Sequence, residues 1–128
     1  MSYTVGMLSL GCAKNRVDAE MILSTLKHAG YRIIENVFMS DIAIVNTCGF
    51  IENAKRESIE EILNLIDLKQ QRIIKSIIIT GCLSERYQQE VANEFPEVDA
   101  VIGIGANADI ANIVSRVLNG EKISMFPS

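Results

Sequence analysis

The chain has 128 residues, of which 48% are hydrophobic and 22% charged, and its formal net charge is -4. These values fit one folded domain with a real apolar core and argue against a disordered chain. No run of Lys and Arg stands out, so we do not expect this domain to bind nucleic acid directly through phosphates. No apolar run approaches the ~20 residues of a membrane span, and no signal peptide opens the chain. We therefore expect a cytoplasmic protein whose thiols stay reduced.

Five apolar segments are predicted to form strands. They are nearly continuous in hydrophobicity rather than alternating, which is typical of parallel strands covered on both faces. In chain order they are Val5–Leu10, a weaker candidate at Tyr31–Ile34, Ile42–Val45, Ile77–Ile79 and Val101–Ile104.

Helical spacing of apolar residues fills most of the intervals between these strands. The predicted helices comprise one through Ile22, Leu26 and Ala29, one from Glu52 to about Gln71, one through Tyr87, Val91 and Phe95 that Pro96 closes, and one over Ile110–Leu118. This alternation predicts an α/β fold, a flavodoxin- or Rossmann-like variation with a mostly parallel five-stranded sheet and helices on both faces.

The connection between the second and third predicted strands is unusually short. Only residues Glu35–Asp41 are available, and no helix is expected there. Parallel neighbours usually need a dozen or more residues to cross over, whereas seven extended residues reach roughly 23–25 Å. An extended crossover just fits, and an antiparallel second strand stays open.

Each of the three cysteines follows a predicted strand and has a glycine neighbour. Cys12 comes after Val5–Leu10, Cys48 after Ile42–Val45 and Cys82 after Ile77–Ile79. In the common strand order 2-1-3-4-5 these three strands are adjacent, and sites form outside the carboxyl ends of parallel strands. The cysteines are therefore predicted to meet at one edge of the sheet.

Thiolates suit zinc or iron–sulfur clusters. A structural zinc site wants four ligands, usually with close Cys-x-x-Cys pairs, and the lone His28 lies at the far end of the first helix, where it is expected to be a surface residue. Three thiolates fit a cubane cluster with one iron left open. Asn15 and Asn46 are poor ligands for soft iron and are expected to position loop backbone through local hydrogen bonds. The alternative is that the cysteines are ordinary small apolar residues.

Two other patterns are weaker. Cys12 and Arg16 after a first strand are similar to a phosphatase loop, but that loop has five residues between its cysteine and its arginine, whereas three lie between them here. Gly103–Ala108 matches the loose dinucleotide fingerprint between strand and helix. It follows the last strand, however, and no further unit supplies the acid that binds the ribose, so a tight turn is the favoured interpretation.

The segments around the cysteines resemble the methylthiotransferases, a radical S-adenosylmethionine family. The resemblance covers essentially the whole chain, as the N-terminal domain of that family, and the Lys-Asn after Cys12 and the Phe-Ile after Cys48 are most like its ribosomal-protein branch. Ala13 and Ala19 replace a proline and a serine that are usual there. The matching segments are Ser9–Glu20, Asn46–Ile51 with Ala54 and Glu57-Ser58, and Thr80–Leu83 with Arg86-Tyr87.

The resemblance implies that Cys12, Cys48 and Cys82 ligate an auxiliary 4Fe–4S cluster. It implies that the complete enzyme inserts a methylthio group into an aspartate of a small-subunit ribosomal protein. A second 4Fe–4S cluster, with S-adenosylmethionine, would lie in a radical domain that these residues lack. The chain is then residues 1–120 as the auxiliary-cluster domain and residues 121–128 as the start of a linker. No catalytic residue is expected in it, and it should be inactive alone.

Two other functions stay open at this point. The chain is alternatively the N-terminal domain of a tRNA-adenosine methylthiotransferase, or a metal-free α/β interaction module whose cysteines are incidental.

Overall fold

A computed structural model describes residues 3–10, 13–47 and 52–127. Its strands form one six-stranded sheet in the order β2-β1-β3-β4-β5-β6, and every neighbouring pair is parallel. The strands are β1 (Thr4–Ser9), β2 (Arg32–Ile33), β3 (Ile42–Thr47), β4 (Ser76–Gly81), β5 (Ala100–Ile102) and β6 (Ile123–Met125). The predicted α/β class is confirmed, and the second strand, whose direction the sequence left open, is parallel.

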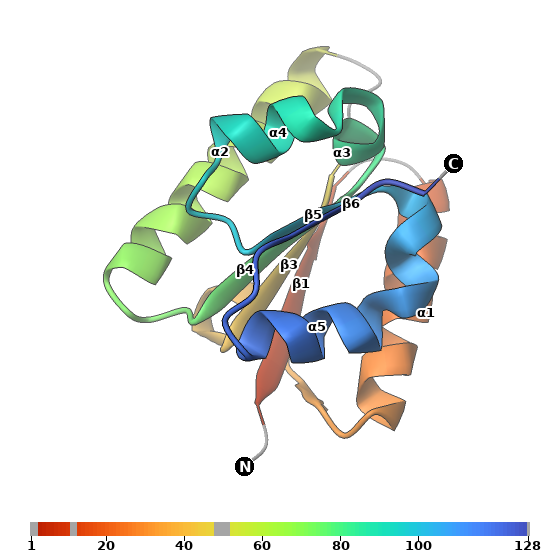
Figure 1. Ribbon diagram of the computed structural model, residues 1–128, viewed down its shortest axis with the longest axis vertical. Coiled ribbons are helices and arrows are strands. Elements are labelled where there is room, and N and C mark those ends of the chain that lie inside the picture. The colour runs from red at the N-terminus through yellow and green to blue at the C-terminus, as the bar shows by residue number, and fades with distance from the viewer. Residues whose placement is uncertain (1–2, 11–12, 48–51, 128) are drawn as a thin grey trace.

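Helices cover both faces of the sheet (Figure 1). Helices α1 (Ala13–His28) and α5 (Ile110–Leu118) pack on one face, where the even-numbered residues Ile42, Ile44 and Ile78 join their core. Helices α2 (Glu52–Gln70), α3 (Cys82–Tyr87) and α4 (Gln89–Glu94) lie on the other face, and their core takes Ala43, Val45 and Ile79. The central strands β3 and β4 are buried along their whole length, which explains their unbroken hydrophobicity. Within the described residues, no helix is both long and apolar enough to cross a membrane.

Two features differ from the sequence-based expectations. The sheet has six strands rather than five, because Ile123–Met125, in the segment expected to begin a linker, pairs with β5. The single helix expected through Tyr87 and Phe95 is two short helices, separated at Gln88, whose φ of 44° and ψ of -115° leave the helical region. A non-glycine residue at positive φ is uncommon and carries no sequence signature that would have announced the break.

A glycine in β1, which has no side chain, explains how the short connection between β2 and β3 passes over that strand. The connection contains one 3-10 turn, η1 (Val37–Met39), and Val37 is buried in the α2-side core. A Cβ on Gly6 of β1 would lie 2.6 Å from the Cα of Val37. The crossover therefore runs directly on the backbone of β1, and glycine inside a strand marks that close approach.

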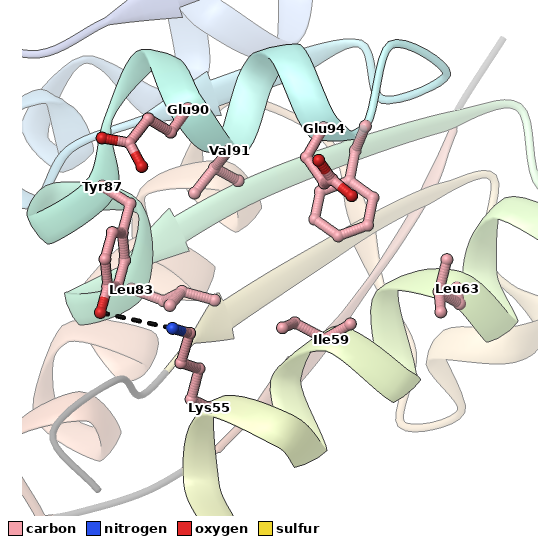
Figure 2. A pocket seen from close by; sticks show the side chains of 9 residues that line it. Lys55, Ile59, Leu63, Leu83, Tyr87, Glu90, Val91 and Glu94 are labelled. Carbon is pink, nitrogen blue, oxygen red and sulfur yellow. Dashed lines mark hydrogen bonds between the residues drawn. The ribbon is translucent and has the colours of Figure 1, made fainter. Parts of the chain in front are cut away.

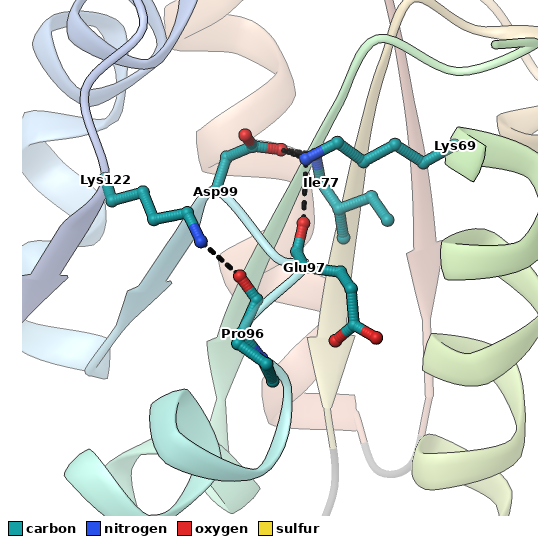
Figure 3. Close-up of polar contacts among 6 residues, drawn as sticks. All are labelled: Lys69, Ile77, Pro96, Glu97, Asp99 and Lys122. Carbon is teal, nitrogen blue, oxygen red and sulfur yellow. Dashed lines mark hydrogen bonds and ion pairs between the residues drawn. The ribbon is translucent and has the colours of Figure 1, made fainter.

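A polar contact group fixes the starts of β4 and β5 (Figure 3). The Asp99 carboxylate accepts hydrogen bonds from Lys69 Nζ at 2.8 Å and from the backbone N–H of Ile77 at 2.9 Å. The Lys122 ammonium donates to the carbonyl of Pro96, and Lys69 Nζ donates to the carbonyl of Glu97 at 2.7 Å. Asp99 thus joins the end of α2 to the two strands.

Replacing Asp99 by alanine is expected to lower the free energy of unfolding by roughly 1–3 kcal/mol, because the N–H of the buried Ile77 would lose its acceptor. Lys69→Met is the matched control. It removes the partly exposed ion pair and the exposed bond from Lys69 Nζ to the carbonyl of Glu97 but keeps the bond from Asp99 to Ile77, and it should cost no more than about 1 kcal/mol. Urea denaturation of both variants measures the difference, and equal losses would show that the Ile77 bond contributes little.

Candidate functional site

The strands that precede the three cysteines are adjacent in the sheet, as predicted. Residues Val5–Ser9 of β1 pair in register with Ile42–Asn46 of β3, and Ile42–Thr47 pair with Ser76–Gly81 of β4. The carboxyl ends of β1, β3 and β4 therefore lie side by side at one edge. Cys12 and Cys48 fall outside the described residues, so the approach of the three sulfurs stays a prediction, while Cys82 is described.

Cys82 is the first residue of α3 and is 7% exposed. The turn that places it depends on Gly81, which has φ 99° and ψ -166°, a conformation essentially restricted to glycine. A Cβ on Gly81 would lie 2.5 Å from the carbonyl oxygen of Thr47, 2.6 Å from its nitrogen and 2.7 Å from Asn46 Oδ1. The loop of Cys82 is therefore packed directly against the two residues that precede Cys48.

Thr47 hydrogen-bonds to both sides of Cys82. Its hydroxyl donates to the carbonyl of Thr80 at 2.6 Å and accepts from the backbone N–H of Leu83 at 3.2 Å. Thr47 is fully buried, so these bonds are shielded from water. The residue directly before Cys48 thus fixes the backbone on which Cys82 is carried.

Asn46 makes the corresponding link to the first cysteine segment. Its backbone carbonyl accepts from the N–H of Leu10 at 2.9 Å, and its Nδ2 donates to Ser9 Oγ at 3.4 Å. Both partners lie within three residues of Cys12. The side-chain bond of Asn46 reaches a side chain on a neighbouring strand, so the expected local bond from its amide to loop backbone stays a prediction. The side chain of Asn15 lies outside the described residues.

A second buried polar pair lies beside this edge. Thr80 Oγ1 donates to Asn107 Oδ1 at 2.5 Å, and both side chains are buried. Among the described residues, Asn107 Nδ2 has no hydrogen-bond partner. An unused buried donor is costly, which makes this atom a candidate contact for an acceptor outside the described residues.

Four residues that support the site were not predicted from the sequence: Thr47, Thr80, Ser84 and Asn107. Ser84 Oγ donates to the carbonyl of Ile102 at 2.6 Å and so holds α3 against β5. Polar residues at the carboxyl ends of otherwise apolar strands were the available signal. His28 is exposed, as predicted, and its Nδ1 lies 2.8 Å from the carbonyl of Ser24. Elsewhere in the described ranges, no three His, Cys, Asp or Glu side chains gather as a metal site would require.

An all-parallel α/β domain with a cysteine within three residues of the ends of β1, β3 and β4 is the class that fold and sequence define together. The chain belongs to the family described as Uncharacterized protein family UPF0004, whose profile matches residues 4–103.

Several curated relatives carry the name ribosomal protein uS12 methylthiotransferase RimO. The protein of Syntrophomonas wolfei subsp. wolfei is 46% identical over 119 residues, which are 93% of this chain and 27% of the relative. That of Thermoanaerobacter sp. (strain X514) is 50% identical over 119 residues, which again are 93% of this chain and 27% of the relative. That of Anaeromyxobacter sp. (strain K) is 49% identical over 90% of this chain and 24% of the relative. The chain thus spans about a quarter of the length of the curated relatives it matches.

Proposed function

We propose that this chain is the auxiliary-cluster domain of a methylthiotransferase that modifies a small-subunit ribosomal protein. In this proposal Cys12, Cys48 and Cys82 hold a 4Fe–4S cluster. The observation that carries it is the adjacency of β1, β3 and β4, because these parallel strands bring the loops that follow them to one edge. The names of the relatives favour the ribosomal-protein branch over the tRNA branch.

The described residues fit a cluster at this edge. Cys82 is nearly buried and is held by hydrogen bonds on both sides, so its position is set without the metal. Gly81 lets the backbone pack where a side chain would not fit. Asn107 Nδ2 is a buried donor without a partner among the described residues, and sulfur atoms of clusters commonly accept such hydrogen bonds.

When bound, the cluster would supply an iron with an open coordination position for an external sulfur ligand. The residues of this chain would hold it and exclude water. Thr47 and Asn46 would keep the three cysteine loops in register, since their bonds join the segments before Cys12, Cys48 and Cys82. Burial of Cys82 would limit the access of oxidants to its sulfur.

The rest of the reaction would belong to the part of the protein that follows. The boundary expected at residue 120 would leave out β6, so we propose that this domain extends through Met125 and that the chain after it leads toward a radical S-adenosylmethionine domain with a second 4Fe–4S cluster. That domain would start the radical chemistry on an aspartate of the ribosomal protein, in the cytoplasm. The 128-residue chain alone should be inactive.

Anaerobic reconstitution with iron and sulfide tests the proposal. We expect the chain to take up ~4 iron and ~4 sulfide and to develop visible charge-transfer absorption, as thiolate-ligated clusters do. A metal-free interaction module would stay colourless, and that outcome on a folded chain would contradict the cluster.

The open iron has a separate test. Methanethiolate added to the reconstituted chain is expected to alter the electron paramagnetic or Mössbauer spectrum, because three cysteines leave one iron without a protein thiolate. If the chain does not retain its cluster, the full-length protein takes its place. A spectrum that never responds, from an intact cluster, would mean that the fourth position is closed.

A further inference from the structure

A groove runs between α2 and the α3–α4 pair on the face opposite α1 and α5. It encloses about 340 Å³. Figure 2 shows its lining side chains converging from the two walls. Most of the side chains that line it are apolar, and one of these side chains, Leu63, is 52% exposed. The lining residues that form this apolar surface are Ile59, Leu63, Leu83, Val91 and Phe95.

The groove begins at the cysteine edge. Leu83, which lines it, directly follows Cys82, and Lys55, at the same end, lies seven positions after Cys48 in sequence. A chain segment bound in the groove would therefore be held beside the place where the cluster is proposed to lie.

The charged side chains that line the groove indicate which kind of partner it would bind. Lys55 contributes one positive charge, and its Nζ lies 3.4 Å from Tyr87 Oη and 4.6 Å from the centre of the Tyr87 ring, so it is held against α3 rather than paired with a carboxylate. Glu90 and Glu94, one helical turn apart on α4, are exposed, and no ion pair is found for either among the described residues. An apolar groove bordered by two carboxylates that form no ion pair within the described residues suits an apolar side chain flanked by cationic ones.

We propose that this groove docks the ribosomal protein substrate through an apolar residue flanked by Lys or Arg. The inference rests on the proposed function, because it takes the substrate to be a ribosomal protein. Proteins that bind RNA carry many Lys and Arg residues to neutralise phosphates, so their segments have the required charge. The net charge of -4 on the chain attracts the same partner and opposes RNA itself.

Titration of fluorescently labelled, purified uS12 into the full 128-residue chain, followed by anisotropy, tests the docking site. Glu90→Lys/Glu94→Lys should weaken binding roughly tenfold, which corresponds to about 1.4 kcal/mol. Leu63→Gln should weaken binding severalfold. Because Leu63 is half exposed, this substitution should change the stability of the fold little. The affinity of the unchanged chain should fall more steeply with added salt than that of the double variant.

The matched control is Glu20→Lys/Glu35→Lys, which makes the same charge change at two exposed glutamates that do not line the groove, the first of them on α1 on the other face of the sheet. It should keep binding within about twofold if the site is local, because distant exposed charges are screened. Equal loss in both double variants, no loss in the groove variant, or no binding to the unchanged chain would overturn the inference. Cluster content, measured on the same samples, reports on the proposed function separately, so either can fail while the other stands.

Discussion

Gly81→Ala is expected to destabilise the domain by about 2–6 kcal/mol. The residue has φ 99° and ψ -166°, where a non-glycine residue costs of order 1–3 kcal/mol. Its new Cβ would lie 2.5 Å and 2.6 Å from backbone atoms of Thr47, and overpacking against rigid backbone typically costs a further 1–3 kcal/mol. Thr47 lies in a fully buried central strand, so it cannot move away cheaply.

Gly120→Ala separates the two causes. Gly120 also has a positive φ, 91°, but nothing lies within 4 Å of a Cβ placed there. This control should therefore show only the cost of the backbone conformation, about 1–3 kcal/mol. Thermal and urea unfolding of both variants measure the difference. Similar losses at the two positions would mean that the contact with Thr47 relaxes and does not constrain the Cys82 loop.

Replacing Cys82 by alanine is expected to abolish cluster incorporation while changing the free energy of unfolding by no more than about 1 kcal/mol. The side chain is small and lies at the rim of the core, so its loss opens little space. The same outcome is expected for Cys12→Ala and Cys48→Ala, since each would remove one of three proposed ligands.

Iron content after anaerobic reconstitution, together with circular dichroism of the metal-free chain, checks this result. Met39→Ala, at a side chain that is 73% exposed, is a control that removes a sulfur atom unconnected with the proposed cluster. A cysteine variant that still takes up a full cluster would be removed from the ligand set. A variant that loses both fold and iron would leave ligation and folding inseparable at that position, and serine would then replace alanine.

Most of the sheet could be predicted because its strands are buried on both faces. The residues of β3 and β4 are apolar without alternation, and this pattern located both strands and their parallel direction. The order of the strands followed from common α/β topology, and it predicted correctly that the three strands that precede the cysteines are neighbours. The helix stripe at Ile110–Leu118 was found for the same reason, since its apolar residues are those that the core buries.

Three features depended on contacts that no local pattern encodes. The crossover after β2 needed only Gly6 opposite Val37, two positions that are 31 apart in sequence. The break at Gln88 places a polar residue in a strained conformation between two helices. Strand β6 is three residues long, and its membership of the sheet is decided by the open edge of β5. At the site, the cysteines stood out by their chemistry, whereas Thr47 and Asn107 act only through partners in other strands and turns.

The lengths of the strands bear on how the protein behaves at high concentration. The long strands β1, β3 and β4 have six residues each and lie inside the sheet, whereas the outermost strands, β2 and β6, have two and three. Unpaired N–H and C=O groups on a long outer strand offer a template on which another copy can add, and short outer strands limit that template. Two molecules meeting edge to edge could form only a few backbone hydrogen bonds, so strand-mediated aggregation of the folded domain is disfavoured by its own sheet.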